Sequence, residues 1–262
     1  MRVRFRDGIL LFVLIGMWIG LTACSELVTA TPPPTLQVVR VTYPPALRPV
    51  SEALQTCVEA NPHIALILNE APVSASLDQV ADLTLRMGFP GSSSVFVAAA
   101  AAIGQEEIVV VANRANSLNR LSVEDLAGLL TGRLENWGQI GGPDAPVEVW
   151  VYPQGNELRD VFDGAVLSGE SITTMAMVAP DPEAMLEAVA GSEGAIGYIP
   201  KAWISAEVRQ VRVDEIQAKL IQPVLVLAES EPWDAPRTLL ACLQTGEGQK
   251  EIQARYLPWE EK

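Results

Sequence analysis

Short apolar runs alternate along the chain with longer segments in which apolar residues recur every three or four positions. The runs are rich in Val, Ile and Leu and predict buried strands, whereas the spaced segments predict amphipathic helices. Alternation of the two predicts an α/β fold. We expect strands at 36–42, 64–68, 83–87, 94–102, 108–112, 146–151, 175–178, 195–199, 208–213 and 224–228, and helices at 45–60, 122–132, 181–191, from 156 onward, and at 236–256 with an interruption near 246–248.

Two of these helices carry clear end signals. Ser122 can cap the start of one helix, where two acidic residues follow, and Gly132 can end it. In the other helix Asp181 is followed by Pro182, and proline is favoured at the first helical position. We therefore expect both helices to begin at these residues.

The first 24 residues have the pattern of a bacterial lipoprotein export signal. Three arginines precede an apolar run, Ile9–Leu21, which leads into Leu21-Thr22-Ala23-Cys24. The run is too short for a membrane span of about 20 residues, and small residues before a cysteine fit cleavage and lipidation at Cys24. We expect the rest of the chain to lie outside the cytoplasm, anchored to the cell membrane through Cys24. The alternative is an uncleaved anchor with an incidental cysteine.

The segment that follows the signal predicts a spacer. Residues 25–35 include three consecutive prolines, which favour an extended, non-helical chain. No comparably long apolar stretch follows Leu21, so we expect no second transmembrane segment. The body after the spacer should be soluble.

The charge of the chain argues against two kinds of partner. The formal net charge is −14, and removal of the signal takes away three arginines and one aspartate, which leaves the remainder still more acidic. Nucleic acid and anionic lipid would both be repelled. Attachment to the membrane would then depend on the acyl chains at Cys24.

Two further cysteines, Cys57 and Cys242, fall on predicted helices far apart in the sequence. In an oxidising compartment they could form one disulfide. Cys57, however, shares an apolar helical stripe with Leu54 and Val58, where a free thiol behaves as a small hydrophobe. We favour two free buried cysteines over a disulfide.

Several short motifs follow one another in a particular order. They are Ile108-Val109-Val110-Val111-x-Asn113, Leu121-Ser122-x-x-Asp125-Leu126, Thr131-Gly132, Asn136-Trp137, Gly141-Gly142, Arg159-Asp160-Val161-Phe162, Ala195-Ile196-Gly197-Tyr198-Ile199-Pro200, Gly246-Glu247-Gly248-Gln249 and Tyr256-Leu257-Pro258. In this order they resemble the phosphate-binding lipoproteins of the phosphate ABC importer. The resemblance covers most of the chain from Val41 to Pro258.

The resemblance implies a two-lobed periplasmic-binding-protein type 2 fold, in which two crossover strands join two α/β lobes and a solute binds in the cleft between them. Lobe 1 would comprise residues 36–104 and 200–262, and lobe 2 residues 105–199. Closure of the lobes requires that the solute binds the closed form better than the open form. The resemblance also implies a monomer that captures a small-molecule solute for the permease subunits of an ABC importer.

The phosphate-binding positions of the family are poorly matched in this chain. In the family, a Ser/Thr-rich loop after the first strand, an aspartate, and an arginine followed by Ser-Gly-Thr at a helix start hold the phosphate. Here the loop is Thr42-Tyr43-Pro44-Pro45, Asp82 stands where a carboxylate is expected, the arginine position falls on Tyr152, and Ser-Gly-Thr falls on Asn156-Glu157-Leu158. Prolines offer no N–H, and Glu157 would repel phosphate from the helix start.

Two interpretations of this mismatch remain open. Either the correspondence slips by a residue or two, so that Gln154 and Asn156 are the donors, or the cleft has changed or lost its ligand. We favour the second, because two separate loops depart together. The candidate ligand-binding residues, which suit a neutral polar or cationic solute better than a dianion, are Thr42, Tyr43, Asp82, Tyr152, Gln154, Asn156 and Glu157.

We therefore predict an extracytoplasmic solute-binding lipoprotein of an ABC importer that departs from its relatives at the phosphate-ligand positions. The alternative is a lipoprotein of the same fold that acts as an interaction or sensor module without a small-molecule ligand. We do not expect an enzyme, because the single histidine, His63, stands at a strand entrance where a surface role is favoured. We also expect no metal or cofactor, since no metal-ligand spacing, nucleophile elbow or phosphate-binding loop occurs.

Overall fold

The computed structural model describes residues 35–72, 81–89 and 97–260 of the chain. The predicted signal peptide with Cys24, residues 25–34 of the predicted linker and positions 94–96 of a predicted strand lie outside these residues. Strands and helices alternate along the described part, and the α/β fold class is confirmed.

The first strands follow the predicted pattern, whereas the first helix is shorter than predicted. These elements are β1 (Gln37–Tyr43), η2 (Pro45–Leu47), α2 (Val50–Glu59), β2 (Ile64–Glu70) and β3 (Leu83–Met87). The single helix predicted at 45–60 is thus a short 3-10 turn followed by α2. The break falls at Pro49, because proline has no backbone N–H to continue the helical hydrogen bonds and its ring crowds the preceding turn.

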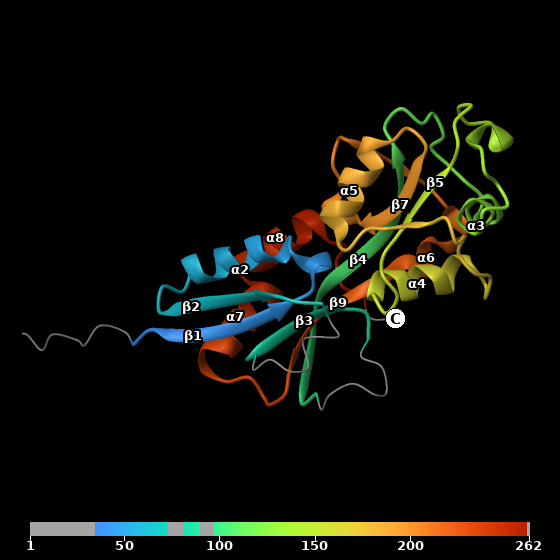
Figure 1. Ribbon diagram of the computed structural model, residues 1–262. Helices are drawn as coiled ribbons and strands as arrows, with labels where there is room; N and C mark the ends of the chain where they lie inside the picture. Colours follow the sequence, from blue (N-terminus) through green and yellow to red (C-terminus); the bar gives the residue numbers. More distant parts are fainter. Residues whose placement is uncertain (1–34, 73–80, 90–96, 261–262) are drawn as a thin grey trace, which may run out of the picture. The chain divides into compact units, whose positions relative to one another are not determined.

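One long strand takes the place of two that the sequence predicted. β4 (Ala99–Asn113) runs through the polar residues at 105–107, which interrupt the apolar pattern of the sequence. It pairs with β9 (Ile221–Ala228) up to position 107 and with β7 (Ala195–Pro200) from position 108 onward. β4 therefore passes from one group of strands to another (Figure 1).

Both capped helices begin where the sequence predicted. The Ser122 side chain accepts a hydrogen bond from a backbone N–H in the first turn of α3 (Val123–Thr131). Gly132 ends that helix with a φ of 77°, a left-handed conformation that glycine adopts without steric cost. Asp181 caps α5 (Pro182–Gly191) in the same way as Ser122 caps α3.

The other elements of the second half complete the fold. They are η4 (Trp137–Ile140), β5 (Glu148–Val151), α4 (Glu157–Val166), β6 (Met177–Val178), η5 (Lys201–Trp203), β8 (Val208–Val211), η6 (Asp214–Ile216), α6 (Gln217–Leu220), α7 (Asp234–Thr245) and α8 (Glu247–Arg255). The sequence did not indicate α6 or the 3-10 turns. The interrupted helix predicted at the C-terminus is two helices, because the backbone becomes extended at Gly246.

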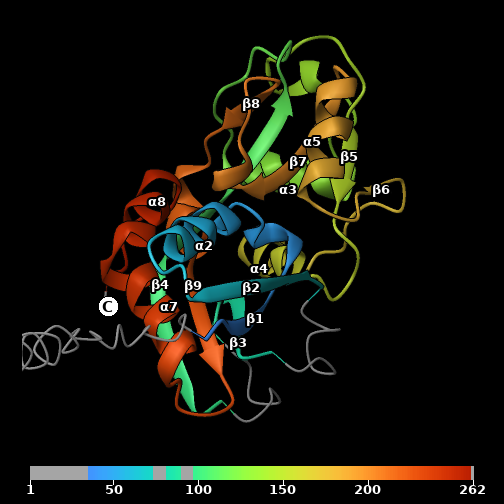
Figure 2. The same ribbon diagram turned by 90° about the vertical axis from the view of Figure 1, so that its left-hand side faces the viewer.

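The strands form one mixed sheet in the order β2-β1-β3-β9-β4-β7-β5-β6, with β8 paired to β4. β1 runs parallel to β2 and β3, whereas β9 is antiparallel to both of its neighbours, β3 and β4. At the other end β5 runs parallel to β6 and β7. Figure 2 shows α5 beside β5 and β7, and α2 and α7 beside the strands from β1 to β3.

Two hydrophobic cores form along this sheet. The first core gathers side chains of β1, β3, β9, α2, α7 and α8, and the second core those of β4, β5, β7, α3, α4 and α5. The second core also contains Val211 and Leu220, which the sequence analysis placed in the second part of lobe 1. They belong to it because β8 pairs with β4 at 110–113, so the chain returns to the first core only with β9.

A disulfide joins Cys57 of α2 to Cys242 of α7, so the prediction of two free cysteines is wrong. Cys57 is fully buried, as its apolar stripe predicted. However, α2 packs against α7 and α8, and this brings two cysteines 185 positions apart to a Cα separation of 5.8 Å. Gly248 of α8 permits this close packing, because a Cβ there would collide with the Cys57 sulfur.

Candidate functional site

A small cavity lies beyond the carboxyl ends of β1, β2, β5 and β6. In open α/β sheets this is the edge at which ligands bind. The cavity volume is about 60 Å³, far below the roughly 300 Å³ of a small ligand pocket. Its lining residues are Pro44, Pro45, Ala46, Pro72, Gly155, Asn156, Glu157, Leu158, Pro180, Asp181 and Pro182.

Prolines make up five of the eleven residues that line this cavity. They follow β1 and β2 on one side and flank the start of α5 on the other. Because proline has no backbone N–H, these loops offer few donors to an oxyanion.

The start of α4 brings Glu157 into the cavity. Asn156 caps the helix, since its side chain accepts a hydrogen bond from the backbone N–H of Leu158 at 2.9 Å. Glu157 is the first helical residue, and Leu158 is buried in the second core. The cap and the buried leucine together fix the direction in which Glu157 leaves the helix.

The Glu157 carboxylate reaches β3. Its Oε1 lies 2.7 Å from Nη2 of Arg86, and the backbone N–H of Met87 donates to the same carboxylate. The Arg86 and Glu157 side chains are 17% and 18% exposed, so the ion pair is largely shielded from water. Because β3 lies among strands of the first core and α4 packs in the second, this pair joins the two.

Burial raises the pKa of Glu157 to about 7. Loss of water around the carboxylate is the largest cause, and the charge and hydrogen bond of Arg86 lower the pKa by less than burial raises it. Asp160 adds a smaller upward contribution. Above pH 7 the positive charge of Arg86 is thus already paired and is not free for a solute anion.

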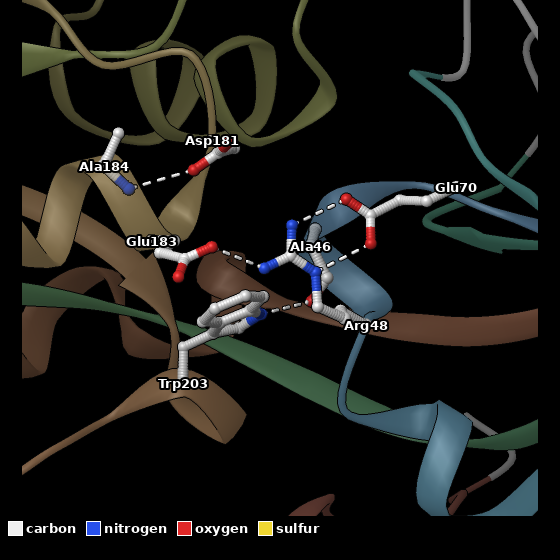
Figure 3. A network of polar contacts seen from close by, with 7 residues as sticks. All are labelled: Ala46, Arg48, Glu70, Asp181, Glu183, Ala184 and Trp203. Atoms are coloured by element: carbon white, nitrogen blue, oxygen red, sulfur yellow. Dashed lines mark hydrogen bonds and ion pairs between the residues drawn. The ribbon is translucent and has the colours of Figure 1, made fainter.

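A second group of polar contacts spans the same two parts of the fold (Figure 3). Arg48 makes two hydrogen bonds of 2.7 Å to Glu70 at the end of β2 and one of 2.7 Å to Glu183 of α5. Its guanidinium lies over the Trp203 ring, 5.0 Å from the centroid, and the indole N–H donates to the Ala46 carbonyl. The hydrogen bonds to Glu70 and then Glu183 raise the pKa of Arg48.

Four of the seven predicted site residues lie at or beside the small cavity. Asn156 and Glu157 line it, and Thr42 and Tyr43 end β1 directly before the lining prolines. Thr42 and Tyr43 are both buried. Burial is the largest cause of the raised pKa of Tyr43, followed by the charge of Glu70.

Asp82 lies at the other end of its strand. Its carboxylate accepts a hydrogen bond of 2.7 Å from the backbone N–H of Arg40, and its own N–H donates to the Arg40 carbonyl at 2.9 Å. This is the amino-terminal end of β3, whereas the cavity lies beyond the carboxyl ends of the strands. The structure therefore places Asp82 on the backbone of β1 and apart from Glu157.

Tyr152 is buried in the second core. Its ring meets Tyr198 edge-on with 5.2 Å between centroids, and Tyr198 stacks on Phe162. Burial raises the pKa of Tyr152 well above the usual value of a tyrosine. Its backbone carbonyl accepts a hydrogen bond of 2.8 Å from Arg159 of α4.

Gln154 lines a different cavity, with a volume of about 550 Å³. This cavity lies along α4 and the segment that leads to β6, and it includes Arg159, Asp163 and Thr173. Arg159 and Asp163 form an ion pair there at 3.2 Å. The structure does not bring Gln154 together with Glu157 in the small cavity.

The two arginines that reach this region, Arg48 and Arg86, were not among the predicted site residues. Arg86 carried a usable signal, because a charge inside the apolar strand Leu83–Met87 is rare without a partner. Arg48 stands among apolar residues and prolines, and its partner Glu183 is 135 positions away. Neither partner could be read from local spacing.

The side chains around the cavity offer carboxylate, amide, guanidinium and phenol groups for hydrogen bonds and ion pairs. Within residues 35–72, 81–89 and 97–260, no group of three or more His, Cys, Asp or Glu is arranged to hold a metal ion. No helix in the described part of the chain is long and apolar enough to cross a membrane.

Solved structures of phosphate-binding proteins share this fold. A phosphate ABC transporter substrate-binding protein from Clostridium perfringens with bound phosphate is 21% identical, with 86% of this chain and 100% of that chain covered and a TM-score of 0.76. A phosphate transport receptor from Vibrio cholerae is 18% identical, with 84% and 99% covered and a TM-score of 0.65. The regulatory domain of Synechocystis CcmR in complex with 2-PG is 14% identical, with 79% and 95% covered and a TM-score of 0.61. This likeness confirms the predicted periplasmic-binding-protein type 2 fold.

A match to a family model identifies the family to which the chain belongs. The model of the PBP superfamily domain matches residues 78–226, more than half of the 262 residues of the chain. The matched range runs from β3 through most of β9 and includes Arg86 and Glu157. The proteins of this family bind solutes and are not a class of enzymes. The chain belongs to the PBP superfamily and has the fold of the phosphate-binding proteins of ABC importers.

Proposed function

We propose that the chain is the solute-binding lipoprotein of an ABC importer and that its cleft takes a solute other than phosphate. The family and the fold support the first part, because such proteins capture solutes outside the cytoplasm for a permease. The Arg86–Glu157 ion pair supports the second part. It places a carboxylate at the start of α4, the position at which the resemblance to the phosphate-binding lipoproteins implies a bound oxyanion.

The lobes of this protein would be organised around the two cores. Lobe 1 would comprise 36–104 together with the segment from β9 onward, and lobe 2 would comprise 105–220. The chain would cross between them in β4 and again at the start of β9. The small cavity would be the innermost part of the cleft in its closed form.

The groups at the cavity favour a neutral polar or cationic solute. Glu157 and Asp181 contribute carboxylates, Asn156 contributes an amide, and the prolines contribute no N–H groups. A dianion would lose its hydration and meet the Glu157 carboxylate, which already occupies Nη2 of Arg86. A hydroxylated or amino-bearing solute could use the acceptors that these residues provide.

Thermal unfolding of the purified protein tests this proposal. Inorganic phosphate should leave the transition unchanged, whereas one member of a panel of sugars, amino acids and polyamines should raise it. A ligand at 100 times its Kd stabilises a protein by about 2.7 kcal/mol, so a true solute gives a clear shift. A saturable shift with phosphate would contradict the exclusion of phosphate but not the role in solute binding. Flat transitions across the whole panel would instead favour an interaction or sensor module.

The lipid anchor has its own test. The Cys24→Ala variant should move from the membrane fraction to the soluble extracytoplasmic fraction or remain as an unprocessed precursor, and it should not incorporate labelled fatty acid. The wild-type protein should incorporate the label and stay with the membrane. Labelling of the variant at the wild-type level would contradict lipidation at Cys24.

A further inference from the structure

Arg86 and Glu157 are held by parts of the fold that meet at the cavity. Arg86 belongs to β3, between β1 and β9, and Glu157 begins α4, whose apolar face lies in the second core. The two residues are 71 positions apart in the sequence. Their contact therefore depends on the approach of α4 to the ends of the strands.

The Arg86 guanidinium is only partly used by this contact. Nη2 donates to Glu157 at 2.7 Å, while Nε is buried and has no hydrogen-bond partner within the described residues. A free oxyanion that faces Nε and Nη2, the two parallel donors that form the fork of the guanidinium, could accept two parallel hydrogen bonds. The Glu157 side chain, whose backbone is fixed in α4, reaches the fork with one oxygen. A water-shielded donor thus remains in the site.

The other groups around the Glu157 carboxylate also favour an anion. The Met87 N–H donates to it, and the first turn of α4 carries the partial positive charge of a helix start. Asp160 and Asp181 oppose this, because Asp160 raises the pKa of Glu157 and Asp181 lines the same cavity. The arginine, the amide and the helix start nevertheless all face one carboxylate.

The structure assigns to Glu157 the role of a built-in anion: its carboxylate occupies an oxyanion site formed by Arg86, the Met87 N–H and the start of α4, and thereby excludes free oxyanions from the cleft. This inference rests on the proposed function in taking the small cavity as part of the solute cleft. It makes Glu157 the residue that sets specificity against small oxyanions such as phosphate and sulfate. A neutral, shorter side chain at position 157 should uncover the site.

Isothermal titration of the Glu157→Ser variant with inorganic phosphate at pH 8 tests the inference. The variant should bind phosphate at least about tenfold more tightly than the wild type. The matched control is Asp160→Asn, which removes the same charge from the same helical turn at an exposed position without touching Arg86. Because exposed charges are screened, this control should change phosphate affinity by less than about twofold.

Two further variants identify the source of the gain. In Arg86→Gln with Glu157→Ser the gained affinity should be lost, because the guanidinium has been removed. Glu157→Gln keeps the shape of the side chain and should gain less than Glu157→Ser, and it replaces that variant if the serine variant fails to fold. No gain in either folded variant, or an equal gain in Asp160→Asn, would overturn the inference.

The outcome is separable from that of the proposed function. If the wild-type protein binds no solute but the Glu157→Ser variant binds phosphate, the proposed role in transport is contradicted and the role of Glu157 as a built-in anion is supported. If the wild-type protein binds a neutral or cationic solute but the Glu157→Ser variant gains no affinity for phosphate, the role in solute binding is supported and the inference about Glu157 is contradicted.

Discussion

Two groups of charged residues connect the first core to the second, and they differ in their access to water. The Arg86–Glu157 pair is 17% and 18% exposed, and a single hydrogen bond joins its side chains. Arg48 is 35% exposed, bonds to Glu70 with two donors and to Glu183 with a third, and lies over Trp203. The exposed group has the better geometry, whereas the buried group has the larger desolvation penalty.

This difference separates the roles of the two groups. A buried ion pair adds little net stability, because desolvation cancels much of the attraction, but removal of one partner is costly. An exposed group adds a modest amount that salt reduces. We therefore expect the Arg48 group to contribute to the stability of the contact between the parts of the fold that form the first and second cores. We expect the Arg86–Glu157 pair to determine which charged solutes the small cavity accepts.

The largest effect is expected when the buried pair is broken from one side. Arg86→Met leaves Glu157 without its cation, and at pH 8 it should lower the free energy of unfolding by about 4 kcal/mol in urea denaturation. Adding Glu157→Leu should restore most of that loss, because no buried charge is then left unpaired. An uncorrected loss in the double variant would mean that packing rather than charge dominates this contact.

The pH dependence of stability gives the next largest effect. Burial raises the pKa of Glu157 from 4.5 to about 7 in the folded protein. Between these values the unfolded chain releases its proton first, so ionisation should lower stability as pH rises through this window by about 3 kcal/mol. Stability should not depend on this group below pH 4.5 or above pH 7.

The Glu157→Gln variant isolates this contribution. Glu106, whose pKa burial raises to about 8, titrates in an overlapping range. The difference between wild type and Glu157→Gln across the pH series removes the Glu106 contribution, since both proteins contain it. A difference that stays constant from pH 4.5 to 7 would show that Glu157 titrates normally.

Removal of the exposed arginine should have a smaller effect. Arg48→Ala should lower the free energy of unfolding by about 1 kcal/mol at low salt, because two partly exposed carboxylates and the Trp203 ring lose their partner. The loss should shrink in 1 M NaCl but not disappear, since the stacking on Trp203 is partly apolar. A salt-independent loss would place this arginine with the buried pair.

The smallest effect is expected for Glu183→Gln. Glu183 is 61% exposed, so its pair with Arg48 should contribute about 0.3 kcal/mol, measured by urea denaturation at low salt. The amide can still accept a hydrogen bond, so the geometry of the Arg48 group should persist. A loss as large as that of Arg48→Ala would contradict the assignment of Glu183 to a screened, exposed contact.

Local signals predicted much of the fold. The helix that starts at Ser122 and ends at Gly132, and the helix capped by Asp181, were predictable because the groups that determine them lie within a few positions. The continuity of β4 through 105–107 was not, because the polar residues there are paired by strands more than a hundred positions away. The disulfide was not predicted for the same reason, since only the packing of α2 on α7 brings its cysteines together.

The candidate site shows the same limit. Glu157 was identified from its place at a helix start, but its partner Arg86 is 71 positions away on a strand. Tyr152 was placed at the site by the resemblance, whereas its ring points into the second core against Tyr198. Short-range order places a residue on an element, and the direction of its side chain depends on the whole fold.

The disulfide between α2 and α7 constrains when folding of the protein can be completed. Its two cysteines are 185 positions apart, so the bond can close only after both helices have been delivered to a place where thiols are oxidised. Until then the two helices are held together by packing alone. The fraction of molecules whose Cys57 and Cys242 react with an alkylating reagent therefore measures how many have not yet formed this disulfide.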